Sequence, residues 1–366
     1  MAESAQRDLL LLYDFLQTRG GAERVLHCLH AHLSAPVCVG FVATASFGDL
    51  FSSEDLIDLG AGSRIPALAI GRVLHAFNGR GAQLAASYRT RIFSGSYAPL
   101  ANRGIGHGRS IYYCHTPPRF LYDLREHYQT HFPAWQRPLL TALRHWLQPR
   151  YEEAVRAMDV VLANSRNVQR RLQHYLGVPS RVVYPPVDID RFRWLADDGY
   201  FLSTARLEPL KRVDMLVRAF RRMPSKRLVI SSGGSELPRL KALAADSPNI
   251  HFSGWLDDRQ LAELIGRARA SIYVPVDEDF GMSPVESMAA GKPVIGVAEG
   301  GLLETVADGE TGILLPPQFG EEDVIAAVSA LDPRRAASMR AACMHRAERF
   351  SRTRFLKEIG AVLHCS

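Results

Sequence analysis

The stretch Glu278-Asp-Phe-Gly-Met-Ser-Pro-Val-Glu286 places two glutamates on either side of seven other residues. It follows an apolar run at 271–276, which predicts a buried strand. Ser283 is a favoured N-cap residue and Pro284 suits a first helical turn, so a helix is expected to begin there. Strand, loop and helix succeed one another, and the first turn of such a helix leaves backbone N–H groups without partners.

This arrangement favours anion binding, because the free N–H groups and the helix dipole both attract negative charge. Carboxylates beside the anion can accept hydrogen bonds from sugar hydroxyls. The combination indicates a nucleotide-sugar site. An alternative stays open, since Ser283 and Glu286 also fit a capping box in which Glu286 only caps its helix.

The same alternation extends in both directions along the chain. In the first half we expect a strand at 8–13, the pair Gly20-Gly21, a helix at 22–33 and strands at 37–42, 111–114, 160–163 and 182–184. In the second half we expect strands at 200–204, 228–230, 249–252 and 293–297. Strands that alternate with helices predict parallel sheets covered on both faces, and therefore an α/β fold.

A length of 366 residues favours two domains, each with its own core. Pro185-Pro186 is the expected hinge, which predicts an N-terminal domain over 1–185 and a C-terminal domain over 186–345. The remaining residues, 346–366, are expected to form a helix. Arginines alternate with apolar residues over 64–93, and we expect a basic amphipathic helix there, although two glycines interrupt it.

Hydrophobic content of 47% and charged content of 22% are ordinary for a soluble globular protein. No apolar run approaches the ~18 residues of a membrane span, and the polar start of the chain lacks the pattern of a secretory signal. Five scattered cysteines without a C-x-x-C pattern argue against a disulfide framework or a zinc site. We therefore expect a cytoplasmic protein with reduced thiols.

The charge is unevenly distributed. Residues 1–185 contain 20 arginines and no lysine against 13 acidic residues, a net charge of +7, whereas the remainder carries −1. Such asymmetry suggests that the N-terminal half faces an anionic surface or substrate. A solvated basic surface without any partner is the alternative.

Loops at the carboxyl ends of parallel strands meet at one crevice, and four such loops of the second half carry candidate residues. They supply Arg206 with Lys211, Gly233 with Gly234, residues 278–283, and Gly300 with Gly301. Two cations, a glycine loop and a helix N-terminus suit a diphosphate. Each feature has an ordinary structural explanation by itself, so the inference rests on their conjunction.

The N-terminal half supplies two further candidates. Gly20-Gly21 precedes a helix that could approach the same ligand, and His115 directly follows a strand within the stiff turn His-Thr-Pro-Pro. A structural role for His115 remains an alternative. The pairs Asp277/Asp279 and Asp188/Asp190 match metal-binding carboxylates, but the cations already neutralise a diphosphate, so no metal ion is expected.

In several of these motifs the chain resembles the retaining glycosyltransferases of family 4. The resemblance rests on segments 20–25, 113–118, 163–165 and 184–188, on Arg206 with Lys211, on the Glu278/Glu286 pair, and on segments 300–306 and 308–312. It implies a GT-B fold, in which two Rossmann-like domains face each other across a cleft. It also implies that the helix at 346–366 crosses back to the N-terminal domain and that no metal ion or other cofactor is needed.

The resemblance assigns roles residue by residue. Arg206 and Lys211 would clamp the donor diphosphate, Glu286 would bind the ribose, and Glu278 would face the donor sugar. His115 would lie near the transferred sugar. The remaining donor-binding positions that it implies are Gly20, Gly21, Gly233, Gly234, Phe280, Gly281, Met282 and Ser283.

Segments 113–118 and 184–188 are similar to those of mannosyltransferases that build bacterial O-antigens and exopolysaccharides. This implies GDP-mannose as donor, a glycan or lipid-diphosphate-linked acceptor, peripheral association with the inner membrane surface, and no nucleic-acid partner. The loop Ser231-Ser-Gly-Gly234 departs from the commoner Gly-x-Gly-Pro, so another UDP- or GDP-sugar stays open as donor.

Two different functions also stay open for a chain of this pattern: an epimerase of the same fold, and a non-catalytic nucleotide-sugar-binding protein. A dinucleotide-dependent oxidoreductase is disfavoured because no G-x-G-x-x-G is present at either glycine loop.

Overall fold

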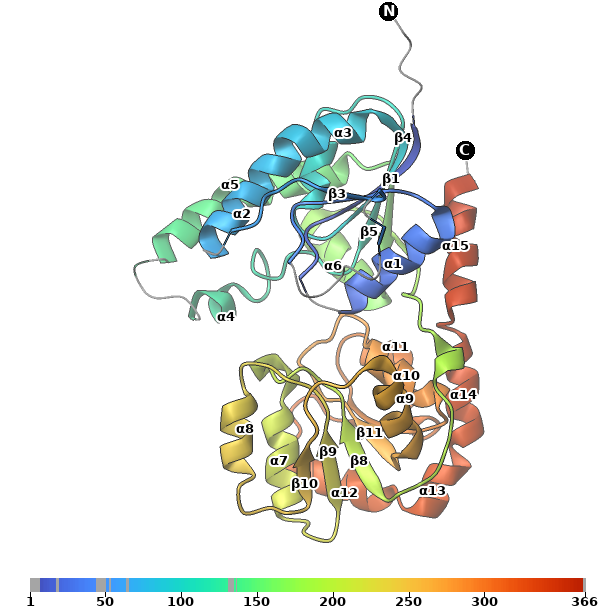
Figure 1. The fold of residues 1–366 in the computed structure, drawn as a ribbon. Helices are drawn as coiled ribbons and strands as arrows, with labels where there is room; N and C mark the ends of the chain where they lie inside the picture. The colour runs from blue at the N-terminus through green and yellow to red at the C-terminus, as the bar shows by residue number, and fades with distance from the viewer. Residues whose placement is uncertain are drawn as a thin grey trace, which may run out of the picture. The chain divides into compact units, whose positions relative to one another are not determined.

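The computed structural model describes residues 7–17, 20–43, 51–52, 54–63, 66–130, 135 and 137–364. The chain divides into two compact units, Met1–Tyr184 and Pro185–Ser366, and each contains its own parallel sheet flanked by helices (Figure 1). The expected α/β class with two doubly wound sheets is confirmed.

The sheet of the first unit has seven parallel strands in the order β3-β2-β1-β4-β5-β6-β7. The strands are β1 (Arg7–Tyr13), β2 (Val37–Val39), β3 (Leu56–Asp58), β4 (Tyr88–Ser94), β5 (Arg109–Cys114), β6 (Val160–Ala163) and β7 (Arg181–Val182). The helices are α1 (Gly21–Leu33), α2 (Pro66–Ala76), α3 (Ala82–Ala86), α4 (Arg125–Thr130), α5 (Arg137–Arg156) and α6 (Arg166–Leu176), with a π-helical turn at Phe77–Gly81. Leu147 and Tyr151 of α5 and Leu172 of α6 are fully buried in the same hydrophobic cluster as the strands, so these helices cover the sheet.

The helix expected over 64–93 is wrong beyond residue 86. Residues 88–94 form β4, which lies between β1 and β5, and residues 64 and 65 lie outside the described residues. Strand conformation is favoured here because aromatic and β-branched residues alternate with arginines. Arg91 is nevertheless buried, and its guanidinium donates to the carbonyls of Tyr88 and His107 at 3.2 and 2.7 Å. Arg91 therefore does not belong to a solvent-facing helix stripe, whereas Arg72 and Arg80 in the helical part are exposed.

The sheet of the second unit has six parallel strands in the order β10-β9-β8-β11-β12-β13. They are β8 (Tyr200–Ser203), β9 (Arg227–Ile230), β10 (Ile250–Phe252), β11 (Ala270–Ile272), β12 (Val294–Val297) and β13 (Gly312–Leu315). The helices are α7 (Val213–Arg221), α8 (Leu237–Leu243), α9 (Asp258–Arg267), α10 (Met282–Ala289), α11 (Leu302–Thr305), α12 (Glu321–Ala330), α13 (Pro333–Ser338), α14 (Arg340–Glu348) and α15 (Arg352–His364).

Both sheets reverse their strand order at one point. From β1 and β4 in the first unit, and from β8 and β11 in the second, the chain winds outward in opposite directions. Helices on the two sides of such a point diverge, which leaves room for a ligand beyond the carboxyl ends of the strands. In the second unit, the loops that begin at this point carry Lys211 and Glu278.

The expected helix at 346–366 is interrupted: α14 ends at Glu348, α15 begins at Arg352, and residues 349–351 lie between them. Within the second unit, the Val187 N–H donates to the Phe350 carbonyl at 2.9 Å and the Arg352 N–H donates to the Val187 carbonyl at 3.2 Å, immediately before α15 begins. The expected return of residues 346–366 to the N-terminal domain stays a prediction, and residues 365 and 366 lie outside the described residues.

Four cysteines in the described ranges are buried and form no disulfide: Cys28, Cys38, Cys114 and Cys343. The fifth, Cys365, lies outside those ranges. None of the described helices is long and apolar enough to cross a membrane.

Asp14, at the end of β1, holds the loop that leaves β4. Its carboxylate accepts hydrogen bonds from the backbone N–H groups of Ser96, Tyr97 and Ala98 at 2.6–2.8 Å. Burial raises the pKa of Asp14 to about 6, although these hydrogen bonds oppose the shift. Gly95 completes the contact, because a Cβ there would overlap the carboxylate.

We expect Asp14→Ala to lower the free energy of unfolding of the N-terminal unit by about 3 kcal/mol or more at pH 7.5, since three N–H donors lose their acceptor. Urea denaturation followed by circular dichroism measures the loss. Asp8→Ala is the control, because Asp8 lies on the same strand and is exposed. Equal stability of the two variants would contradict this role for Asp14.

Candidate functional site

Lys211 and Glu278 form an ion pair at the point where the second sheet reverses its order. The Lys211 Nζ lies 2.6 Å from Glu278 Oε2 and donates to the Tyr273 hydroxyl at 3.2 Å. Lys211 lies in a short 3-10 turn of the segment that follows β8, whereas Tyr273 and Glu278 lie in the segment that follows β11. Two residues that sequence analysis assigned to one crevice are therefore brought together.

The ion pair holds charge in a mostly buried environment, with less than a fifth of either side chain exposed. Burial lowers the pKa of Lys211, but Tyr273 and the Glu278 carboxylate outweigh it, so the pKa lies above its usual range. Burial has the opposite effect on the tyrosine: it raises the pKa of Tyr273, so this hydroxyl stays protonated at neutral pH. Lys211 therefore carries a positive charge at neutral pH, which suits the binding of a phosphate group.

Arg212, which sequence analysis did not single out, holds the loop that carries Glu278. Its guanidinium donates to the carbonyls of Val274 and Pro275 at 2.7 and 2.8 Å, and also to Glu299 at 3.3 Å. The other oxygen of the Glu299 carboxylate accepts the N–H of Asp277 at 2.9 Å. Arg212 directly follows Lys211 in the chain, and this adjacency was the signal that could have identified it.

Gly300 and Gly301 contact the backbone of the same loop. The Gly301 N–H donates to the Glu278 carbonyl at 2.7 Å, and a Cβ at Gly301 would lie 2.5 Å from the Phe280 Cα. A Cβ at Gly300, where φ is +55°, would overlap the Glu278 carbonyl. These glycines are needed because two backbones approach more closely than any side chain permits.

The helix after Glu278 begins earlier than expected. α10 starts at Met282 and its N-cap is Gly281, with φ 89°, so the expected N-cap at Ser283 is wrong. Glycine takes this place because the chain turns through a left-handed conformation before the helix. Pro284 does lie in the first turn, as expected. The backbone N–H groups in the first turn of α10 have no partners within the helix, and its N-cap, Gly281, has no side chain to accept from them.

Glu286 lies one turn inside α10, where its side chain is buried. No side chain caps this helix, so the alternative in which Glu286 forms a capping box with Ser283 is wrong. Phe280 turns into the core and packs edge-on against Phe350, with ring centroids 5.3 Å apart. The Phe280 backbone is thereby anchored beside the start of the helix.

The loop that carries Arg206 contacts the glycine pair Gly233-Gly234. Leu207, next to Arg206, donates its N–H to the Gly233 carbonyl at 3.0 Å, and a Cβ at Gly234 would overlap the Leu207 carbonyl. The side chain of Arg206 itself is exposed and makes no hydrogen bond or ion pair with a described residue. The pair Gly233-Gly234 thus positions the loop of Arg206, while ligand contact by these residues stays a prediction.

The candidate residues of the first unit lie at the carboxyl ends of their strands. Gly20 is the N-cap of α1, Gly21 is its first residue, and the Gly20 N–H donates to Glu23 at 3.1 Å. His115 directly follows β5, with its ring 5.2 Å from that of Tyr113. Burial lowers the pKa of His115 to about 4, so its imidazole is neutral at physiological pH.

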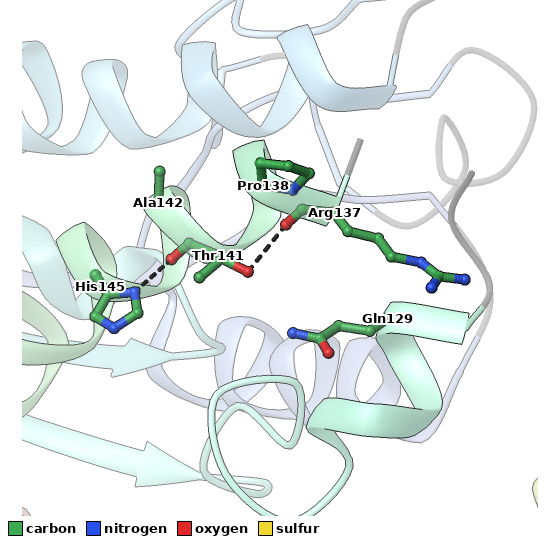
Figure 2. Close-up of a pocket in the computed structure, with 6 residues that line it drawn as sticks. All are labelled: Gln129, Arg137, Pro138, Thr141, Ala142 and His145. Atoms are coloured by element: carbon green, nitrogen blue, oxygen red, sulfur yellow. Dashed lines mark hydrogen bonds between the residues drawn. The ribbon is translucent and has the colours of Figure 1, made fainter. Parts of the chain in front are cut away.

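A separate hollow of the first unit lies between α4 and α5, and none of the predicted site residues line it (Figure 2). Its lining residues are Gln129, Arg137, Pro138, Thr141, Ala142 and His145. In the part of the chain that the structure describes, no three metal-ligating side chains come together. The expectation that no metal ion is needed stays a prediction.

Comparison with known families divides the chain near the boundary of the two units. The family described as Glycosyltransferase Family 4 matches residues 19–191, and the family described as Glycosyl transferases group 1 matches residues 187–342. Together these matches account for most of the chain.

Two curated relatives match parts of the chain. A D-inositol 3-phosphate glycosyltransferase of Mycobacteroides abscessus is 31% identical over 224 residues, which are 55% of this chain and 50% of the relative. The alpha-1,3/1,6-mannosyltransferase ALG2 of Rhizomucor pusillus is 29% identical over 187 residues, 37% of this chain and 41% of the relative. The matches thus span about half the length of these relatives or less.

Among solved structures, the Anabaena protein HepE, determined in complex with UDP and glucose, superposes with a TM-score of 0.76 at 19% identity. The superposition covers 98% of this chain and 99% of HepE. At this identity the likeness concerns the fold alone, and it confirms the expected GT-B fold.

We expect Arg212→Lys to loosen residues 274–278, because a lysine ammonium cannot donate to two carbonyls and a carboxylate in the fork geometry of a guanidinium. Hydrogen exchange of the amides in residues 274–282 should become about tenfold faster, equivalent to the loss of one hydrogen bond of about 1.4 kcal/mol. Arg218→Lys, an exposed position on the following helix α7, is the matched control. Identical exchange in the two variants would contradict the role of Arg212.

Proposed function

This chain belongs to the GT-B glycosyltransferases of family 4, and we propose that it transfers a hexosyl group from a nucleotide-diphosphate sugar to an acceptor hydroxyl. One observation carries the proposal: Lys211 and Glu278 form an ion pair at the switch point of the second sheet, with Glu278 in the loop that leads to the N-terminus of α10. A cation and a helix N-terminus suit the diphosphate, and the carboxylate suits sugar hydroxyls.

In the proposed complex, Arg206 and Lys211 bind the diphosphate and stabilise the negative charge that develops as it leaves. Arg206 is exposed, so its side chain is free to turn toward a ligand. The backbone at Phe280–Ser283 binds the phosphate or the sugar, with Gly233 and Gly234 shaping the adjacent loop. Glu286 binds the ribose, and its burial beneath the helix start would shield that contact from water.

The reaction we propose retains the configuration of the anomeric carbon. The bond between this carbon and the phosphate oxygen breaks, and its electron pair stays with the leaving diphosphate. The acceptor oxygen bonds to the same face of the sugar, and its proton passes to the leaving phosphate. His115, neutral at physiological pH, serves as a hydrogen-bond partner for the transferred sugar and adds no positive charge.

For the donor we propose GDP-mannose. The segments 113–118 and 184–188 support it, as does the similarity to a relative named as a mannosyltransferase. The solved structure of HepE with UDP and glucose supports the alternative of a UDP-sugar. The acceptor we propose is a glycan or a lipid diphosphate of bacterial surface polysaccharide synthesis, reached from the cytoplasmic face of the membrane without a metal ion.

A thermal-shift comparison of GDP, UDP, GDP-mannose and UDP-glucose tests the donor. At a ligand concentration 100 times Kd, binding stabilises the folded protein by about 2.7 kcal/mol, which raises Tm by several degrees. We expect the guanine nucleotides to give the larger rise. A larger rise with the uridine nucleotides would replace the donor but keep the transferase, and no rise with any of the four would contradict the site.

Removal of the Lys211 ammonium group should weaken nucleotide binding. We expect Lys211→Ala to bind the nucleoside diphosphate about 10- to 100-fold more weakly by calorimetry, the value of one charge-assisted hydrogen bond or two. Lys241→Ala, an exposed lysine of the same unit, is the matched control and should bind normally.

Because Lys211→Ala also leaves Glu278 without its ion-pair partner, Arg206→Ala is measured beside it. The side chain of Arg206 is exposed and makes no contact on which the fold of the described residues depends, so this variant should fold normally while its affinity falls. Normal affinity in both variants would rule out the proposed diphosphate site.

A further inference from the structure

Arg171 is a buried cation of the first unit to which the proposed function gives no role. It lies on α6, where 7% of the residue is exposed. Val168 and Leu172 on the same helix are fully buried in the hydrophobic cluster, so an apolar residue could also fill the position of Arg171. Burial of a guanidinium costs free energy unless it is hydrogen-bonded, and apolar replacements of buried charges are often neutral or stabilising. Packing alone therefore does not account for an arginine here.

The Arg171 guanidinium reaches the turn that carries His115. Its Nη1 donates to the Thr116 Oγ1 at 2.9 Å, between residues that are 55 positions apart in the chain. A hydrogen bond from a charged donor is stronger than one between neutral groups. The contact joins α6 to the residue next to His115, and it thereby links the position of the histidine to that of the helix.

The turn at 115–118 begins where the strand ladder ends. Cys114 is the last residue of β5 that pairs with β6, opposite Ala163. Pro117 and Pro118 have no N–H group, so neither can donate a backbone hydrogen bond that would fix the turn. The side chain of Thr116 supplies a contact that these two positions cannot.

The helix that carries Arg171 is held at both ends. At its start, Ser165 directly follows β6 and its side chain accepts the Val168 N–H at 3.0 Å. At its end, Arg156 of α5 donates to the Leu176 carbonyl at 3.1 Å. A donor on such a helix is a fixed point from which the neighbouring turn can be oriented.

The imidazole ring of His115 has a separate support. It packs edge-on against the ring of Tyr113, whose hydroxyl donates to the Val183 carbonyl at 2.9 Å. Tyr113 thus supports the ring, while Arg171 holds the residue that follows it in the chain. Two such contacts restrict the orientation of the imidazole, which a side chain needs if it is to meet one hydroxyl of a bound sugar.

We propose that Arg171 is a positioning residue: through Thr116 it holds the His115 turn in the orientation that contacts the transferred sugar. The inference rests on the proposed function and adds a residue to it. Arg171 does not touch the sugar in this arrangement and acts only through the turn.

Carbethoxylation of His115 by diethyl pyrocarbonate at pH 7, measured by peptide mass spectrometry, tests the positioning role. The reagent attacks a neutral imidazole that solvent can reach, so its rate reports how often the turn opens. We expect Arg171→Leu to be labelled at His115 about tenfold faster than wild type, because one charge-assisted hydrogen bond is lost. Its Tm should stay close to that of wild type, since leucine suits a buried position. Arg171→Lys keeps a donor and should restore most of the slow labelling.

Arg170→Leu is the matched control. It makes the same change at the preceding residue of α6, which is exposed and donates to Asn167, and its labelling should equal that of wild type. Thr116→Val removes the acceptor instead and nearly keeps the side-chain shape, so it should be labelled as fast as Arg171→Leu and decides the matter if that variant does not fold. Wild-type labelling of Thr116→Val, or equal labelling of Arg171→Leu and Arg170→Leu, would overturn the positioning role.

Calorimetry with GDP, GDP-mannose, UDP and UDP-glucose separates this inference from the proposed function. We expect Arg171→Leu to bind the preferred nucleoside diphosphate normally, because the groups proposed for it belong to the second unit. It should bind the corresponding sugar nucleotide about tenfold more weakly, through loss of the hydrogen bond from His115. Equal affinity of wild type and Arg171→Leu for that sugar nucleotide would reject this inference alone. No binding of any of the four ligands by wild type would reject the proposed function, and with it the sugar contact.

Discussion

The ion pair between Lys211 and Glu278 joins two loops that leave the second sheet at β8 and β11, on either side of the point where its strand order reverses. Parallel strands bring their carboxyl ends to one edge, but they do not by themselves bring two side chains to 2.6 Å. That distance requires both loops to be short and rigid. The residues around the ion pair hold the two loops in place.

Contacts to the backbone contribute to this rigidity, beside the packing of Phe280 on Phe350. Arg212 ties the end of the β11 segment to Glu299, and Gly300 and Gly301 let the next loop pass directly beneath Glu278. Arg212 and Gly301 thus hold the loop backbone around Glu278, while Lys211 holds its carboxylate. Catalytic geometry generally depends on such support, because electrostatic stabilisation is effective only when the groups are already in place.

The first unit uses buried charge differently. Asp14 and Arg91 both bind backbone groups and thereby fix loops and strand ends, whereas most other arginines of this unit remain at the surface. The arginines of the N-terminal half thus include Arg91, which has a structural role, beside residues that face solvent.

Sequence by itself determined the alternation of strands and helices, the α/β class, and the candidate residues Lys211 and Glu278, because local periodicity and loop position follow from the order of residues. It also predicted β6 at its observed bounds. It missed β4, because the arginines within 88–94 continue the basic pattern that predicts an amphipathic helix. In the structure Arg91 is instead buried and donates to the carbonyl of His107.

Only the tertiary structure decided the rest. Gly281 as N-cap, Arg212 as the anchor of the loop, and the supporting place of Gly300 and Gly301 all depend on backbones that approach from distant parts of the chain. A sequence pattern records which residues can turn or pair, but the partner of each is chosen by packing, which acts only after the sheet has formed.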